Sequence, residues 1–223
     1  MRRCAFLIVI LAACGGDDAG VRDDAAPDTP PDAADMCGAT AVYFTGEYVD
    51  WDSTEVDFLG IFDATLAVVG DAGRTDRTAP NGRFELCLPN DPQVLVEVAP
   101  IGDYVAGTIV VIKDVLGANG TFSLRSFTAA RGQMPPFGYD AAKAQVYVHV
   151  IGAARAVDVS SAHAAGFHFD GTAWVAGQTG TDVYMPNIDP AGGVTKIAVT
   201  AATEVGTVPI AAGAFTYVAV AAL

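Results

Sequence analysis

The segment AVDVSSAHAAGFHFDG (residues 156–171) gathers side chains of the kinds that catalyse hydrolysis or bind metals. It holds His163, His168, two serines and two aspartates, the second of which is Asp170. Serine, histidine and aspartate can act as the nucleophile, the base and the orienting group of a hydrolase. The two histidines could instead bind zinc with Asp170 as the third ligand and His149 as a further candidate. Two hypotheses, a hydrolase site and a metal site, therefore start from this segment.

The spacing within the segment favours a solvated strand and loop over both kinds of site. Successive side chains of a strand point to opposite faces, so His163 and His168, five residues apart, are directed to opposite faces unless a bulge intervenes. Catalytic triads bring together residues from separate elements, and the sequence has no GxSxG nucleophile motif. A hydrolase that uses the His163 and His168 region is therefore our third hypothesis for function.

A second stretch, YVDWDSTEVD (residues 48–57), combines carboxylates with aromatic rings. Its oxygens could bind calcium, but the ligand spacing of known calcium loops is absent, so an acidic solvated loop is the alternative interpretation. No other cofactor is expected. Tyr48 and Trp51, with Trp174 farther along the chain, could form an aromatic platform for a sugar ring or a protein partner. The alternative places these rings in the core.

The amino end has the organisation of a signal for export. Two arginines precede nine apolar or small residues, a run too short to span a bilayer. Leu11, two alanines and Cys14 follow in the order that resembles the lipobox of bacterial lipoproteins. The resemblance implies a signal peptide over residues 1–13, cleavage before Cys14 and a diacylglyceryl thioether on that cysteine. The alternative is a plain secretory signal with an incidental cysteine.

Residues 14–35 are rich in aspartate, alanine and proline and hold no aromatic residue. Such a segment buries too little apolar surface to offset the entropy of ordering, so we expect a disordered tether that holds a folded module off a membrane.

The chain is strongly acidic. Its formal charge is −14, and it becomes −16 once the two signal arginines are removed. Because a chain this negative repels phosphate groups, a nucleic-acid partner is not expected. The expected location is the cell envelope, and Gly15, by resemblance to enterobacterial lipoproteins, favours the outer membrane over the inner.

The cysteine count predicts one disulfide. Once Cys4 leaves with the signal and Cys14 is acylated, Cys37 and Cys87 remain. Two thiols in an oxidising compartment are expected to pair, which requires Cα atoms within about 7 Å. Two unrelated buried thiols are the alternative.

The sequence from about residue 36 onward is typical of an all-β protein. Its apolar segments are short and rich in valine, isoleucine, threonine and aromatic residues. Asn81-Gly82 predicts a tight turn between antiparallel strands. The strand after it alternates, so that Phe84, Leu86 and Leu88 share one face.

The order of these signals resembles the carboxypeptidase regulatory-like domain, a transthyretin-like β-sandwich found as an accessory module in bacterial surface proteins. The residues that carry the resemblance are Gly46, Asp50, Ala64, Val68, Asn81, Gly82, Phe84, Leu86 and Pro89. It implies a first antiparallel β-sandwich, which we extend over residues 36–132.

A second β-sandwich is predicted over residues 140–223. RGQMPPFGYDAAK breaks the strand periodicity before it. In the strand AQVYVHVIG we expect the valines to point inward and Tyr147 and His149 outward. The motif MPNIDP also echoes LPNDP about a hundred residues earlier. We therefore predict two related, immunoglobulin-sized sandwiches in tandem after the acidic tether.

Three functions follow from these features, in order of preference. The first is a non-enzymatic, membrane-anchored envelope lipoprotein whose β-sandwich modules serve as a scaffold or bind a protein. The second is a carbohydrate-binding surface module that uses the aromatic platform. The third is the hydrolase described above. The expected partners are the bilayer, through acylated Cys14, and an envelope protein or a glycan.

Overall fold

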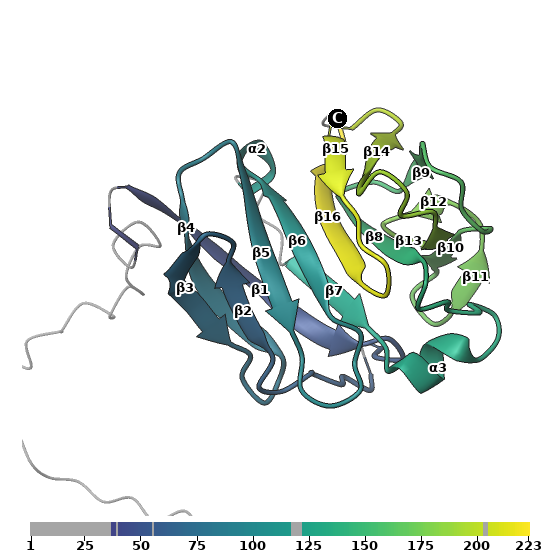
Figure 1. Ribbon diagram of the computed structural model, residues 1–223, viewed down its shortest axis with the longest axis horizontal. Helices are drawn as coiled ribbons and strands as arrows, with labels where there is room; N and C mark the ends of the chain where they lie inside the picture. The colour runs from purple at the N-terminus through teal and green to yellow at the C-terminus, as the bar shows by residue number, and fades with distance from the viewer. Residues whose placement is uncertain (1–36, 39, 55, 117–121, 203–204) are drawn as a thin grey trace, which may run out of the picture. The chain divides into compact units, whose positions relative to one another are not determined.

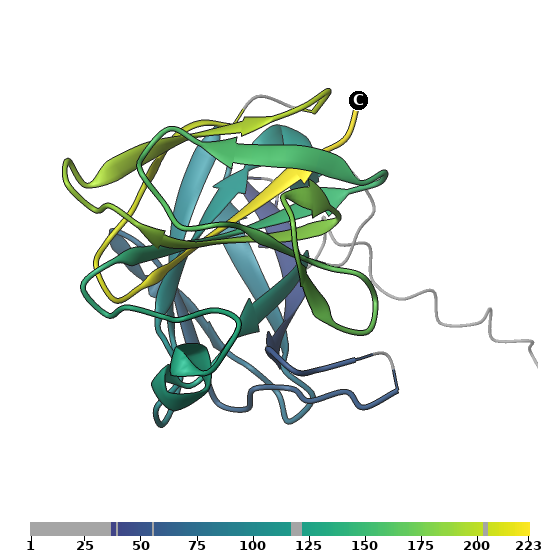
Figure 2. The same ribbon diagram turned by 90° about the vertical axis from the view of Figure 1, so that its right-hand side faces the viewer.

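The computed structural model describes residues 37–38, 40–54, 56–116, 122–202 and 205–223. The fold is all-β, as the sequence predicts, and its sheets pack face to face (Figures 1 and 2). The expected signal peptide, Cys14 and the expected tether lie outside the described residues. Among the residues that are described, no helix is long and apolar enough to cross a membrane.

The strands and helices are short, as is usual for β-sandwiches. The strands of the amino-terminal half are β1 (Ala41–Asp50), β2 (Thr65–Val68), β3 (Asp71–Arg77), β4 (Arg83–Pro89), β5 (Gln93–Ala99), β6 (Gly107–Ile112) and β7 (Phe122–Ser126). Those that follow are β8 (Ala144–Ile151), β9 (Arg155–Val159), β10 (Phe167–Phe169), β11 (Trp174–Ala176), β12 (Thr179–Gly180), β13 (Asp182–Ile188), β14 (Val194–Val199), β15 (Gly206–Pro209) and β16 (Phe215–Ala221). The helices are α2 (Lys113–Leu116) and α3 (Ala129–Gln133).

Three sheets form from these strands. Their strand orders are β4-β1-β7, β11-β10-β13-β8-β16-β6-β5-β2-β3 and β12-β9-β14-β15. One hydrophobic core lies between the three-stranded and the nine-stranded sheet, and it holds most of the aromatic rings. A second core, mostly of valine and isoleucine, joins the nine-stranded sheet to the four-stranded sheet.

The central strands of the large sheet are buried on both faces. In β8, Val146, Val148 and Val150 belong to the second core, whereas Tyr147 belongs to the first. The expectation that Tyr147 points outward is wrong, and His149 is only partly exposed. A strand covered on both faces needs apolar residues at successive positions, which explains the apolar run of β16 as well.

The two halves of the chain do not form separate sandwiches, which corrects the predicted tandem arrangement. The last strand, β16, lies between β6 of the first half and β8 of the second and pairs with both in parallel. Phe137 and Tyr139, within the expected linker, are buried in the shared core. The described residues from Cys37 onward therefore cluster as one compact unit. The pairing of β1 with β7 is also parallel, so the fold is not wholly antiparallel.

The turn at Asn81-Gly82 forms as predicted, but it joins strands of different sheets. β3 is the edge strand of the nine-stranded sheet, whereas β4 pairs with β1 in the three-stranded sheet. Gly82 has a φ of 76°, and a Cβ there would lie 2.2 Å from the Tyr48 carbonyl oxygen. Glycine is needed because positive φ and this close approach exclude a side chain.

The predicted disulfide between Cys37 and Cys87 is confirmed. The two Cα atoms lie 5.4 Å apart, within the range that a disulfide spans. Cys87 lies opposite Tyr43 in the β1–β4 register, near the beginning of β1. Leu86 and Leu88 point into the core from β4. The bond therefore fastens the start of the described chain to the three-stranded sheet.

β1 runs away from this disulfide toward an end of the fold that we call the loop end. The loop end comprises the β1–β2 connection (51–64), the β3–β4 turn (78–82), the β5–β6 connection (100–106) and the segment around α3 (127–139). An antiparallel bridge joins Tyr104 to Thr128, and Gly60 packs against the turn at Asn81. The connections of the loop end thus meet at one side of the module, with α3 among them (Figure 1).

Candidate functional site

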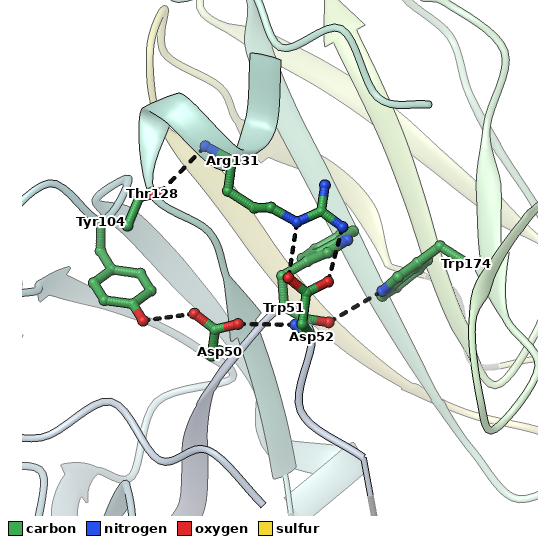
Figure 3. A network of polar contacts seen from close by, with 7 residues as sticks. All are labelled: Asp50, Trp51, Asp52, Tyr104, Thr128, Arg131 and Trp174. Carbon is green, nitrogen blue, oxygen red and sulfur yellow. Dashed lines mark hydrogen bonds and ion pairs between the residues drawn. The ribbon is translucent and has the colours of Figure 1, made fainter. Parts of the chain in front are cut away.

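A polar network ties the loop end together (Figure 3). The Tyr104 hydroxyl donates a hydrogen bond of 2.5 Å to Asp50 Oδ2, and the Asp52 backbone N–H donates one of 2.9 Å to Asp50 Oδ1. Arg131 donates from Nε and Nη2 to the two carboxylate oxygens of Asp52, each at 2.8 Å. Bidentate pairs of this geometry are the most specific ion pairs in proteins.

The network joins elements that lie far apart in the sequence. Asp50 ends β1, Tyr104 belongs to the β5–β6 connection, and Arg131 lies in α3, whose N-cap residue Thr128 accepts a hydrogen bond from the Arg131 N–H. Asp52 raises the pKa of Arg131, and burial together with Asp50 raises the pKa of Tyr104. The loop end is therefore a preorganised surface.

The predicted aromatic platform is wrong for two of its three residues. Tyr48 and Trp51 are fully buried and belong to the core. Trp174 is partly buried and stacks on Trp51 with ring centroids 4.1 Å apart. Its indole N–H donates to the Trp51 carbonyl oxygen at 3.3 Å (Figure 3). Only Trp174 remains available for contact with a ligand.

A small hollow lies beside Trp174, and we call it the tryptophan hollow. Its volume is about 230 Å³. Its lining residues are Trp51, Asp52, Arg131, Pro136, Phe137, Phe169, Thr172, Ala173 and Trp174. Aromatic rings thus form one part of its wall, and the paired charges of Asp52 and Arg131 form another.

The β1–β2 connection displays apolar side chains to solvent, and we call residues 56–62 the apolar loop. Val56 is 91% exposed, Phe62 55%, Leu59 48% and Phe58 46%. The loop is held in place, because Leu59 O accepts from the Asp50 N–H at 2.8 Å and Ser53 Oγ accepts from the Leu59 N–H at 3.0 Å. The sequence analysis considered the acidic residues 48–57 and did not single out the apolar run VDFLGIF (56–62), which was the available signal.

Two further apolar side chains of the loop end are exposed. They are Ile101 in the β5–β6 connection and Met134 after α3, each more than half exposed. Apolar side chains displayed over several neighbouring connections are typical of a surface that binds a partner.

A second polar cluster centres on Asp182, at the start of β13. Its Oδ1 accepts from the Tyr147 hydroxyl at 2.5 Å and lies 2.8 Å from His149 Nδ1. Burial raises the pKa of Asp182, but the hydrogen bond and charge of His149, the Tyr147 hydroxyl and the charge of Arg125 outweigh burial, so its pKa lies below the usual value. The ionised carboxylate is therefore part of the folded structure.

Replacing Asp182 by asparagine is expected to lower the free energy of unfolding by about 2 kcal/mol at neutral pH, because a buried charge-assisted hydrogen bond is weakened. A carboxylate whose pKa is depressed on folding stabilises the protein above its unfolded pKa of about 4 and loses that effect as pH falls through the folded value. The deficit of Asp182→Asn should therefore shrink below about pH 4, as chemical denaturation at a series of pH values would measure.

Asp158→Asn is the matched control for this prediction. Asp158 lies 3.5 Å from His163 Nε2, but its side chain is 70% exposed, and exposed pairs contribute about 0–1 kcal/mol. Equal losses in the two variants, or a deficit in Asp182→Asn that stays constant with pH, would contradict the role assigned to the buried carboxylate.

A larger hollow, which we call the arginine hollow, lies next to this cluster. Its volume is about 510 Å³. Its lining residues are Arg125, Ala154, His168, Phe169, Asp170, Gly171, Thr179, Gly180, Thr181 and Asp182. Arg125 lies over the Phe169 ring, 4.4 Å from its centroid, and donates to the Ser53 carbonyl oxygen at 2.6 Å.

The structure gives His163 and His168 different surroundings. His163 faces Asp158, whereas His168 lines the arginine hollow with Asp170. Asp170 Oδ1 accepts hydrogen bonds from Thr172 and from the Ala173 N–H, which close the β10–β11 turn. These are the surroundings of a strand and loop, the interpretation favoured by the spacing.

Neither candidate metal site gathers a set of ligands in the part of the chain that is described. No group of three or more His, Cys, Asp or Glu residues there could hold a metal ion. Of the candidate zinc ligands, His149 pairs instead with Asp182. In the acidic stretch proposed for calcium, the oxygens of Asp50 and Asp52 bond to Tyr104, to backbone and to Arg131.

Comparisons with known proteins add one structural likeness. No protein-family model and no curated protein matches the chain. A solved structure of the TIE protein of Bacillus anthracis is similar with a TM-score of 0.25 and 12% sequence identity, over 82% of this chain. The chain spans about a third (34%) of the length of that structure. A TM-score of this size supports no argument about fold or function.

Proposed function

We propose that this protein is a lipid-anchored protein of the cell envelope, held in the outer membrane through Cys14. Its β-sandwich module is a non-enzymatic scaffold or interaction unit that binds an envelope protein through the apolar loop. The lipobox at Leu11 to Cys14 and the acidic segment over residues 14–35 support the anchor and the tether. The preorganised loop end supports the interaction role.

One observation carries the proposal, namely that Cys37, the first described residue after the expected tether, and the apolar loop lie at opposite ends of β1. The disulfide of Cys37 holds the chain near the beginning of this strand. The ten residues of β1 span about 30 Å at 3.3 Å per residue, and the apolar loop follows Asp50. A module attached at one end presents the other end to partners.

The anchor is tested by replacing Cys14 with serine. The native chain is expected to incorporate a labelled fatty acid and to remain with membranes, because the thiol of Cys14 is the acceptor of the lipid. The Cys14→Ser chain should carry no label and remain unprocessed. Label that persists in Cys14→Ser would refute the anchor.

The interaction surface is tested with a photoreactive amino acid at Leu59 or at Val69 in cells that produce the full chain. Both side chains are 48% exposed. Val69 lies in the β2–β3 turn beside Pro89, at the end of the module near the disulfide. We expect a discrete crosslinked product from position 59 and none from position 69. The absence of a product at position 59, or equal products at both positions, would refute binding through the apolar loop.

A further inference from the structure

The two hollows lie on either side of one hairpin turn and share one aromatic wall. Phe169 lines both of them. Of the β10–β11 turn, Asp170 and Gly171 line the arginine hollow, whereas Thr172 and Ala173 line the tryptophan hollow. The hydrogen bonds that Asp170 accepts from Thr172 and Ala173 hold the turn rigid. A single extended ligand could therefore contact both hollows across Phe169.

The charges that line the hollows disfavour an anionic ligand. Two guanidinium groups, of Arg125 and Arg131, face three carboxylates, so the formal balance is −1 with histidine neutral. Both guanidinium groups are already engaged, Arg131 with Asp52 and Arg125 with the Ser53 carbonyl oxygen. A phosphate or carboxylate would have to compete with these partners for the guanidinium groups, and the net charge of −14 would repel it.

Cationic and purely apolar ligands fit no better. A cation would be repelled by the two guanidinium groups that line the hollows. An apolar ligand would cover the exposed hydroxyl of Thr179 without offering it a hydrogen bond in place of water, at a cost of about 1–3 kcal/mol. A neutral ligand rich in hydroxyl groups avoids both penalties.

A sugar ring combines the two surfaces that the tryptophan hollow offers. The faces of a pyranose carry C–H bonds, which pack on aromatic rings, and its rim carries hydroxyls that donate and accept hydrogen bonds. Trp174 and Phe169, both partly exposed, supply the aromatic wall. The ion pair of Asp52 and Arg131 uses two N–H groups of the guanidinium, so other N–H groups and carboxylate lone pairs remain for the hydroxyls.

We propose that the two hollows bind one neutral oligosaccharide. One sugar ring lies against Trp174 in the tryptophan hollow, and the adjoining part crosses Phe169 into the arginine hollow beside Thr179 and Thr181. This site goes beyond the function proposed above, because its ligand is a glycan and its residues are not those of the apolar loop. Either proposal can therefore fail without the other.

The test is a titration of residues 14–223, produced without the signal segment and with Cys14→Ser, with neutral di- and trisaccharides of glucose, xylose, mannose and N-acetylglucosamine, followed by NMR of the amide and indole N–H groups. At least one of these sugars, at millimolar concentration, should shift the indole N–H of Trp174 and the amide of Thr179. Trp174→Ala should weaken binding about tenfold, the size expected for loss of one stacking ring. Val194→Ala is the control, because Val194 is an exposed apolar residue outside both hollows and outside the apolar loop.

Arg131→Gln and Thr179→Ala keep the test valid should Trp174→Ala fail to fold. Arg131 forms a surface ion pair and Thr179 is exposed, so both variants should fold and should bind several-fold more weakly. Three results would each overturn the proposal. They are no shift with any neutral sugar, tighter binding of uronic or sulfated oligosaccharides than of neutral ones, or undiminished binding in both of these variants.

Discussion

Replacing Trp51 by alanine is expected to lower the free energy of unfolding of the whole module by about 4 kcal/mol, within the range of large aromatic deletions from a core. Trp51 is fully buried at the end of β1. The rings around it are those of Phe127, Phe137, Tyr147, Trp174, Tyr184 and Phe215. All but Phe127 follow residue 132, so one side chain of the first half packs mainly against the second half.

Chemical denaturation followed by two probes would measure this effect. Tyrosine near-ultraviolet signals report on the aromatic core, and far-ultraviolet circular dichroism reports on all sheets. The two transitions should coincide in the native chain and shift together in Trp51→Ala. Val69→Ala, at an exposed position, is the control and should change the stability by less than about 0.5 kcal/mol. Separate transitions, only one of which moves, would contradict a single cooperative unit.

Removal of the disulfide is expected to lower the free energy of unfolding by about 2–4 kcal/mol. The bond closes a loop with a sequence separation of 50, for which the chain-entropy model gives about 4 kcal/mol. The variant is Cys37→Ser with Cys87→Ser, in a chain whose Cys4 and Cys14 are also serine. Its denaturation midpoint should match that of the same chain with Cys37 and Cys87 intact but reduced.

Which part of the chain loses stability when the disulfide is removed distinguishes tandem domains from a single shared unit. Tandem domains would confine the effect to residues 36–132, because the bond lies in that half. The shared nine-stranded sheet and the insertion of β16 between β6 and β8 predict that the whole module loses stability in one transition. An unchanged transition for the carboxyl-terminal strands, seen by hydrogen exchange, would contradict the shared unit.

Part of the candidate site could be predicted from the sequence, and the rest could not. Trp174 was singled out by residue type alone and does line a hollow. Its expected companions Tyr48 and Trp51 are buried, because their exposure depends on which sheets cover β1. The Asp52–Arg131 pair joins residues 79 apart, and no local pattern marks such a pair. The same holds for Asp182 and Tyr147, 35 residues apart.

The sequence by itself determined the all-β class, the Asn81-Gly82 turn, the inward face of β4 and the disulfide between Cys37 and Cys87. These features follow from local causes, namely the period of apolar residues, the positive φ that Gly82 adopts and the count of available thiols. Each cause acts within a few residues, or depends on composition alone. The expected signal peptide and acidic tether also follow from local sequence patterns, and they stay predictions.

Only the tertiary structure decided how the strands assemble. Strand pairing is set by the sum of side-chain contacts across a whole sheet, so nothing near β16 indicates that it lies between β6 and β8. Burial on both faces of β8 follows from that assembly, as does the burial of Phe137 and Tyr139 where a linker was expected. The two hollows arise for the same reason, because residues from β7, α3 and the β10–β11 hairpin meet only when the sheets pack together.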